Sequence, residues 1–263
     1  MINEDPFQVK PRRYTLTPQD FASLSVTAIG QRFKSLFADE QERARAIHDF
    51  VRQHILFGYC LQFDSTPTSY TLKRRLGHGT AQTNLFITLL RAADIEAYAH
   101  FVIIRKDLLY QLLPKHFYER VPDLISHAYA EVNVKNVWCR LDSYIMDDQL
   151  IKFAKNRLIQ SSWEAGYGVH VRATNFWDGK SDAFCQLVDP DHPIEDHGRQ
   201  ENIKSYFRSQ QYPHRFFGIS YSRWFQLGFP SQMPQWMKET NERIDRIRQS
   251  TRTALLAMTA RSC

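Results

Sequence analysis

The chain lacks the cysteine patterns that mark disulfide frameworks and zinc sites. Its 263 residues include four cysteines, Cys60, Cys139, Cys185 and Cys263, and none belongs to a Cys-x-x-Cys pair. Single, scattered cysteines are typical of buried or incidental thiols. We therefore expect neither a disulfide scaffold nor a bound metal, and no motif in the chain calls for a cofactor.

Long apolar runs are also missing. Residues 1–13 contain no apolar core of the kind found in a signal peptide. The most apolar region of the chain is interrupted by Arg91, Asp94, Glu96 and Arg105. No stretch therefore approaches the roughly 20 apolar residues that cross a bilayer. We expect a cytoplasmic protein that has no membrane partner.

Basic residues exceed acidic ones only slightly, with a formal net charge of +6. A nucleic-acid-binding protein needs Lys and Arg clustered on one face. The short basic cluster at 73–75 stands alone, and the one at 243–252 is interrupted by acids, as on a solvated helix face. We expect no nucleic-acid partner. A mild positive field would instead steer an anionic substrate or a carrier protein.

Helical periodicity dominates the first third and the end of the chain, and no internal repeat is visible. Thr17, followed by Pro18, is a candidate N-cap for a first helix. Apolar residues at helical spacing predict helices over about 39–55, over about 80–93 and from about residue 235 onward. The apolar face of the 80–93 helix is wide, which predicts a helix packed centrally.

Strand patterns follow the central helix. Residues 97–104 form one strand candidate, and strict alternation over 127–134 and 137–144 predicts a hairpin with Lys135-Asn136 as its turn. Helices followed by antiparallel strands indicate an α+β fold. We expect a core over residues 1–150 and a helical C-terminal extension over 151–263, packed on the core as one folded unit.

The hairpin predicts a polar face. A two-residue turn at 135–136 pairs residues whose numbers sum to 271, which places Asp142 opposite Tyr129. Side chains two residues apart share a face of the sheet. The face opposite the apolar one is then expected to carry His127, Tyr129, Glu131, Arg140, Asp142 and Tyr144.

On this face His127 and Asp142 are diagonal neighbours. Diagonal positions lie roughly 7–8 Å apart at the backbone, close enough for an imidazole–carboxylate hydrogen bond. Such a bond fixes the ring tautomer and raises its basicity, as a general base requires. A purely structural pair on an exposed sheet is the alternative, and the hairpin by itself favours it slightly.

Three segments taken together resemble the core of the bacterial transglutaminase-like superfamily, which is related in architecture to papain-like cysteine proteases. They are 42–59 (ERARAIHDFVRQHILFGY), 72–101 (LKRRLGHGTAQTNLFITLLRAADIEAYAHF) and 127–147 (HAYAEVNVKNVWCRLDSYIMD). The resemblance spans roughly residues 15–150 and implies a central helix packed on an antiparallel sheet. More weakly, Gly166–Gly168 and the helix around 241–248 are similar to a C-terminal region of one bacterial subgroup.

The resemblance assigns roles position by position. His127 matches the catalytic histidine and Asp142 the acid that orients it, with Asp147 as a less favoured substitute. Gly77-His78-Gly79 matches the family's Gly-x-Cys turn, so Gly79 stands where the nucleophilic cysteine is expected. Glycine has no side chain, so the covalent route through an acyl-enzyme is closed.

Three interpretations follow from the glycine. The favoured one is an enzyme without the covalent step, in which His127 held by Asp142 performs acid–base chemistry: a cyclisation, elimination, isomerisation or acyl transfer in a biosynthetic pathway. Backbone N–H groups at the start of the central helix would stabilise an oxyanion. The expected substrate is a small acyl, amide or peptidyl molecule, free or attached to a carrier protein. A pseudoenzyme that binds a peptide or metabolite is the second interpretation, and an inactivated Cys-His-Asp acyltransferase or amidase is the third.

Other residues have weaker claims on the site. His78, Tyr129 and Tyr144 are candidates for assisting residues, although a loop position near solvent is the favoured interpretation of His78. Cys60 could replace the missing thiol, but a semi-buried loop thiol is the simpler expectation. The Asp- and His-rich stretch 176–197 fits no familiar metal-ligand spacing and is expected to be a polar surface loop.

Overall fold

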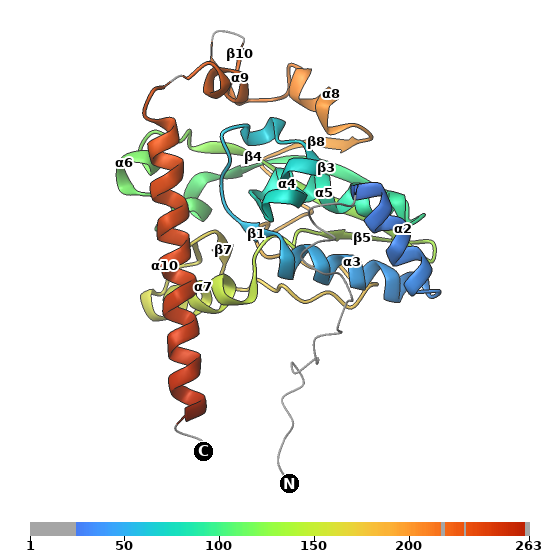
Figure 1. Cartoon of the computed structure of the whole chain (residues 1–263). Helices are drawn as coiled ribbons and strands as arrows, with labels where there is room; N and C mark the ends of the chain where they lie inside the picture. The colour runs from blue at the N-terminus through green and yellow to red at the C-terminus, as the bar shows by residue number, and fades with distance from the viewer. Residues whose placement is uncertain (1–24, 217–218, 229, 261–263) are drawn as a thin grey trace.

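The computed structural model describes residues 25–216, 219–228 and 230–260, with a mixed α+β architecture (Figure 1). The predicted N-cap at Thr17 and the fourth cysteine, Cys263, lie outside the described residues. The first described helix is α2 (Val26–Leu36), whose N-cap Ser25 accepts a hydrogen bond from the backbone N–H of Ala28.

A four-stranded antiparallel sheet forms one layer of the molecule. Its strands lie in the order β5 (Val137–Leu141), β4 (Leu124–Val134), β3 (Ala97–Arg105) and β8 (Glu195–Gln200). β8 comes from beyond residue 150 and pairs with β3. The C-terminal part of the chain therefore completes the same sheet as the core.

The hairpin formed by β4 and β5 has the predicted register. Val134 pairs with Val137 and Ala130 with Leu141, so the partners' numbers sum to 271. Lys135 and Asn136 both have positive φ, 51° and 65°, as the tight turn between twisted strands requires.

The predicted central helix is α5 (Gly79–Ala92), and it packs on β3 and β4. Its buried residues Leu85, Phe86 and Leu89 have no exposed surface. Three further helices cover α5: α2, α3 (Glu40–His54) and α4 (Thr68–Arg74). Burial on most sides explains the wide apolar face that marks this helix in the sequence.

Two short parallel strands fix the start of α5. They are β1 (Leu56–Phe57) and β2 (Leu76–Gly77), and Phe57 pairs with Gly77. Between them run the 3-10 helix η1 (Phe63–Ser65) and α4. The segment between β1 and α5 thus contains two short helices, and it holds the first turn of α5 beside β1.

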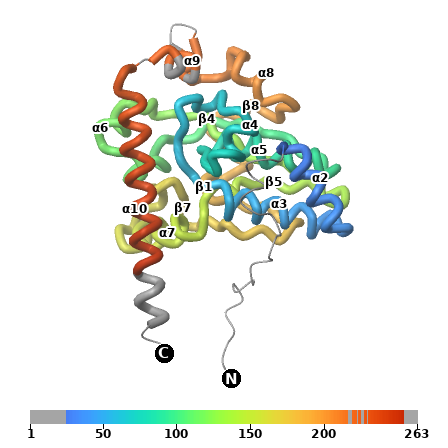
Figure 2. Tube along the Cα trace, viewed as in Figure 1, coloured from blue at the N-terminus to red at the C-terminus, as the bar shows by residue number. Residues whose placement is uncertain are grey.

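The elements not yet described are several short ones, α7 and one long helix, α10. In chain order the elements outside the sheet are η2 (Lys106–Leu109), α6 (Lys115–Tyr118), α7 (Asp148–Ser161), β6 (Ala165–Gly166), β7 (Val169–His170), α8 (Ile203–Arg208), β9 (Arg215–Phe216), β10 (Ile219–Ser220), α9 (Tyr221–Gln226) and α10 (Met233–Ala260). Figure 2 shows α10 running along one side of the molecule, past α6 and α7.

Buried polar contacts attach α10 to the core. The guanidinium of Arg248 contacts Asp147 at 2.8 Å and donates to the carbonyl of Phe57 at 2.8 Å. The side-chain amide of Asn241 bonds both the N–H and the carbonyl of Tyr59. Asp147 also caps α7 by accepting from Leu150 N. Asp147 is therefore committed to α7 and α10 and does not serve as the partner of His127.

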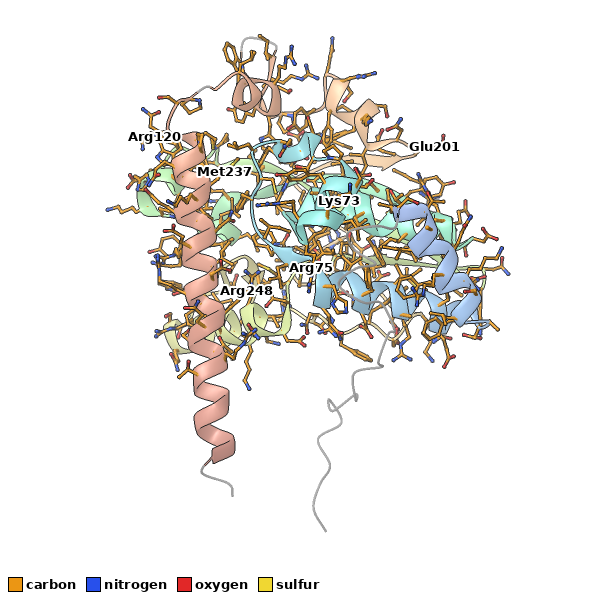
Figure 3. The ribbon with its side chains drawn as sticks, viewed as in Figure 1. Lys73, Arg75, Arg120, Glu201, Met237 and Arg248 are labelled. Atoms are coloured by element: carbon orange, nitrogen blue, oxygen red, sulfur yellow. The ribbon has the colours of Figure 1, made fainter. Side chains whose placement is uncertain are left out.

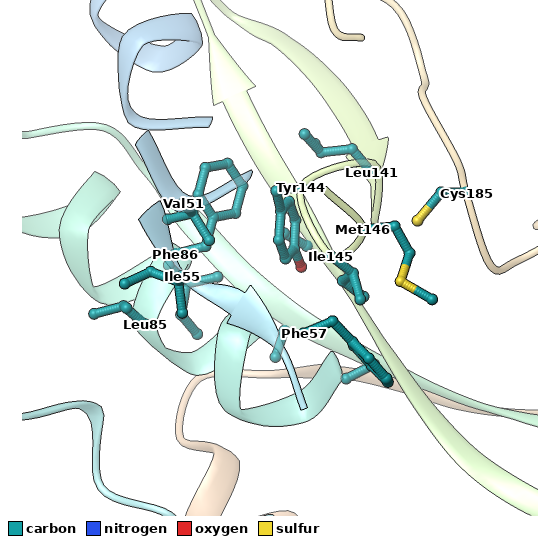
Figure 4. Close-up of a cluster of buried hydrophobic side chains, with 14 of the residues drawn as sticks. Val51, Ile55, Phe57, Leu85, Phe86, Leu141, Tyr144, Ile145, Met146 and Cys185 are labelled. Carbon is teal, nitrogen blue, oxygen red and sulfur yellow. The ribbon is translucent and has the colours of Figure 1, made fainter. Parts of the chain in front are cut away.

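The predicted place of Tyr144 is wrong. β5 ends at Leu141, so Tyr144 is not on the sheet face opposite His127. Its side chain is fully buried beside Phe86, with ring centroids 4.3 Å apart (Figure 4). Its hydroxyl shares a 2.8 Å hydrogen bond with Thr83 of α5. Tyr144 thus ties the central helix to the chain that follows the hairpin.

In the described ranges, no helix is both long and apolar enough to cross a membrane.

Candidate active site

His127 and Asp142 form the pair that the sequence predicts, and the structure buries it. His127 Nε2 lies 2.9 Å from Asp142 Oδ2, and the two side chains are 5% and 0% exposed. His127 stands on β4, whereas Asp142 follows the last residue of β5. Because Asp142 engages Nε2, Nδ1 is the ring nitrogen left for a substrate.

A distant segment of the chain encloses the carboxylate. Residues 183–187 run beside the end of β5, and Asp142 N donates to Ala183 O at 3.1 Å. The carboxylate in turn accepts backbone N–H bonds from Cys185 at 2.5 Å, Gln186 at 3.2 Å and Leu187 at 2.9 Å. A buried anion needs such donors to offset its desolvation. The orientation of His127 is therefore fixed by a carboxylate that is itself held by three consecutive backbone N–H groups.

Gly79 opens α5, as the Gly-x-Cys alignment implies. A Cβ at this position would meet Gln186 Oε1 and Ile145 Cδ1, each at 3.4 Å, which is ordinary contact. Its φ lies outside the left-handed region that favours glycine, unlike that of Gly168 at 84°. The backbone therefore does not require glycine at 79, and a side chain would fit there.

A cavity of about 830 Å³ connects these groups, and both Gly79 and His127 line it. Its walls are mostly apolar and come from η1, η2, α6, α9 and α10; they include Leu108, Leu113, Phe117, Val121, Met233 and Trp236. Figure 3 shows Arg120 and Met237, two further lining residues, near the upper part of α10. The arrangement is that of a ligand pocket: apolar walls with a few polar groups gathered together.

His78 lies in this cavity and not near solvent, so the favoured expectation for it is wrong. Its side chain is 8% exposed, and its Nε2 lies 2.9 Å from Asp64 Oδ1. The Tyr212 hydroxyl donates to the other oxygen of Asp64. Burial opposes ionisation of Asp64, but the bonds from His78 and Tyr212 hold the pKa of this carboxyl below its usual range. The cavity therefore contains a second imidazole–carboxylate pair.

Tyr129 is on the predicted sheet face but outside the cavity lining. Its ring stacks on His100 with centroids 4.7 Å apart and packs against Leu187 and Phe184. It thus supports the segment that encloses Asp142. With Tyr144 in the core, neither tyrosine can touch a substrate in this cavity.

The described cysteines do not supply a nucleophile. Cys60, Cys139 and Cys185 are buried free thiols, and none of them lines the cavity. Burial raises the pKa of Cys60, and it raises the pKa of Cys185 well above its ordinary value. Thiols in such surroundings are poor nucleophiles.

The polar stretch 176–197 lies apart from the cavity, with the exception of Gln186. His192 bonds Asp189, whereas His197 bonds Glu195 and Tyr206, so the two histidines do not share a ligand site. Within the described residues, no group of three or more His, Cys, Asp or Glu side chains could hold a metal ion.

Sequence reasoning missed three residues of the site. Asp64 and His214 carry no periodic or motif signal, because Asp64 lies in a three-residue 3-10 helix and His214 in an irregular segment. Gln186 bonds Gly168 O through its side chain and Asp142 through its backbone, and its amide oxygen faces Gly79. The Gly166–Gly168 turn, already visible in the sequence, is the only pointer toward this contact.

One comparison, with protein-family models, matches the core of the chain. Residues 27–143 match the family model described as the transglutaminase-like superfamily. A solved structure from Cytophaga hutchinsonii, described as a "putative cysteine protease", is similar at 18% identity with a TM-score of 0.29, over 48% of this chain and 42% of that one. The chain thus spans less than half the length of that structure, and no curated protein matches. Residues 27–143, which contain Gly79, His127 and Asp142, are thus similar to the transglutaminase-like superfamily, over a little less than half of the chain.

Proposed function

We propose that this protein is an enzyme that performs acid–base chemistry on an acyl or amide compound without a covalent intermediate. The observation that carries the proposal is the His127–Asp142 pair, buried and aimed into an apolar cavity beside a helix start that has no nucleophilic side chain. Two of the substrate's own groups would then react with each other, or water would attack, in place of the missing thiol.

In this mechanism His127 Nδ1 takes a proton from the attacking hydroxyl, amine or water as that group adds to a carbonyl. Asp142 keeps the imidazole in the required tautomer by accepting from Nε2. The first N–H groups of α5 have no partner within the helix, since its hydrogen bonds begin with Gln82 N to His78 O. They would stabilise the oxyanion that forms beside Gly79.

The cavity supports a substrate with a substantial apolar group. Its size and lining suit a medium-length acyl chain or an aromatic acyl group. Arg120 lines the same cavity and is exposed, with its guanidinium 5.2 Å from the Trp236 ring. An exposed cation at the rim suits a carboxylate or phosphate, such as that of an acyl group attached to a carrier protein.

A test uses p-nitrophenyl esters from acetate to octanoate as probes, because they report general-base hydrolysis without knowledge of the natural substrate. The wild type is expected to hydrolyse the longer esters best, and His127→Ala and Asp142→Asn to lower kcat/KM by roughly 10²-fold or more. His192→Ala, which removes an exposed imidazole outside the cavity, is the matched control.

Equal rates in the wild type and His127→Ala would refute the enzymatic proposal. The alternative function is ligand binding without chemistry, which the apolar cavity would also allow. In that case an octanoyl ester would raise the Tm and remain intact. Hydrolysis that depends on His127 rules this alternative out.

A further inference from the structure

The cavity holds a second imidazole, His78, whose environment resembles that of His127. Each ring is more than nine-tenths buried and lines the same cavity. In each, Nε2 is hydrogen-bonded to a buried carboxylate at 2.9 Å. In both rings this leaves Nδ1 as the nitrogen without a carboxylate partner. Nothing in the acid–base mechanism with His127 alone accounts for this duplication.

The Nδ1 atom of His78 is buried and has no hydrogen-bond partner. Buried polar atoms without partners are rare, because each one costs the free energy of its lost hydration. Other elements fix the ring in place: it stacks on Phe63 with centroids 4.7 Å apart and on Tyr59 at 5.9 Å. The ring is thus held firmly in the cavity wall with one nitrogen unsatisfied, and a ligand group that reaches this nitrogen would supply the missing partner.

The contacts of Asp64 hold its carboxylate in the position that orients the His78 ring. The carboxylate is fixed by the Tyr212 hydroxyl on one oxygen and by His78 on the other. His214 lies next to Tyr212 and uses its own Nε2 to accept from the backbone N–H of Ser126, the residue before His127. His214 is therefore occupied in joining the two pairs, and His78 is the ring left available.

We propose that His78, oriented by Asp64, is the second catalytic residue of this cavity and acts as the general acid that protonates the leaving group. The proposal rests on the proposed function of His127. For an acyl transfer R–CO–X + H–Y, the neutral ring of His127 takes the proton of Y–H as the Y–C bond forms. The doubly protonated ring of His78, whose Nε2–H donates to Asp64, gives the proton on its Nδ1 to X as the C–X bond breaks. The products are R–CO–Y and H–X, and proton exchange with solvent restores both rings.

This division of labour replaces what a single catalytic histidine does in two successive steps. With a thiol nucleophile, one imidazole can act first as a base and later as an acid, because the covalent intermediate separates the steps. A direct attack has no such intermediate, so proton removal and proton delivery are required in one step, at different atoms. Substrates with poor leaving groups, such as alkyl esters and amides, would need the acid most.

The test compares two octanoyl esters that differ in leaving group. p-Nitrophenolate leaves readily without a proton, whereas methoxide does not. His78→Gln is expected to lower kcat/KM for methyl octanoate by about 10²-fold, and at least tenfold more than for the p-nitrophenyl ester. Asp64→Asn should change the ratio in the same direction, and Tyr212→Phe more weakly. His192→Gln is the matched control.

The outcomes separate the two proposals. If His127→Ala abolishes hydrolysis of both esters but His78→Gln slows both equally, His78 has only a structural role and this inference fails alone. If His127→Ala has no effect, or the wild type hydrolyses neither ester, the proposed function fails and this inference fails with it. Urea unfolding of each variant checks that the fold is retained.

A second measurement is independent of turnover. Nitrogen-15 imidazole spectra, assigned by difference with His78→Gln, should show a neutral ring protonated at Nε2 and bare at Nδ1 at alkaline pH. A ring protonated at Nδ1 instead would overturn the inference, because Asp64 would then not orient the nitrogen that faces the substrate.

Discussion

Restoring the missing thiol gives the sharpest test of the site's geometry. In Gly79→Cys the new Cβ would meet its two nearest atoms at 3.4 Å, so the variant should fold without strain. Its sulfur would stand at the N-terminus of α5, in the cavity that His127 also lines. A helix N-terminus and a neighbouring imidazolium both stabilise a thiolate.

The expected effect can be estimated from the thiolate fraction. A free cysteine has a pKa of about 8.5, and cysteines in such sites fall to about 3.5–7.5. At pH 6 the thiolate fraction then rises from below about 1% to between about 3% and nearly 100% across that range, so alkylation by iodoacetamide should be about 10- to 10²-fold faster than for an ordinary thiol. Mass spectrometry of the peptide containing residue 79 measures the rate and distinguishes it from the native cysteines.

Two further variants separate the causes. Adding His127→Ala to Gly79→Cys should remove most of the acceleration. Ser25→Cys places an exposed thiol at the N-cap of α2 without a histidine partner, and so reports the contribution of a helix N-terminus alone. An alkylation rate at residue 79 that is independent of His127 would refute the argument that the imidazole faces the first turn of α5.

Four other changes have defined outcomes. Asp142→Asn should lower the free energy of unfolding by about 2–4 kcal/mol in urea, because an amide cannot accept all the donors around Asp142; an unchanged midpoint would contradict this. Gly79→Ala should raise that free energy by about 0.4–1 kcal/mol, and a loss would show that the site has no room. Burial lowers the pKa of His48, so the unfolded chain takes up a proton below about pH 6.5 that the folded chain does not. Stability should therefore be full above that pH and fall below it, and His48→Gln should flatten the decline measured by urea unfolding across pH 5–8. Met237→Trp should narrow the cavity and raise KM for octanoyl esters more than for acetyl esters.

The hairpin shows how far the sequence could predict the site. Alternation and a two-residue turn fix the register, and both are local, so the pairing of Ala130 with Leu141 could be foreseen. The same pattern extended β5 to Tyr144, although the strand ends at Leu141. The strand ends there because Ala183, more than 40 residues downstream, accepts the N–H bonds of Asp142 and Ser143. Contacts at such separation leave no periodic signal.

The sequence therefore predicted the His127–Asp142 contact but not the segment that buries it. A diagonal pair on the sheet would leave Asp142 on an exposed face, whereas the structure buries it under the segment 183–187. The second pair was less predictable still. Asp64 and His78 belong to the irregular chain between β1 and α5, where neither residue falls in a repeating pattern. Only the family resemblance pointed toward this turn.

A comparison of Gly79 with Gly168 shows whether the fold requires glycine at position 79. Gly168 has φ 84°, and a Cβ there would lie 2.0 Å from Met146 Cε, so its backbone demands glycine. The backbone and the neighbours of Gly79 do not require glycine. The lack of a side chain at 79 therefore changes the chemistry of the site and is not needed for folding. The His127–Asp142 pair stays buried all the same, although removing a carboxylate from water costs several kcal/mol. A pocket that only retained an apolar ligand would be more stable with apolar side chains at both positions, so the buried pair favours chemistry that uses the imidazole.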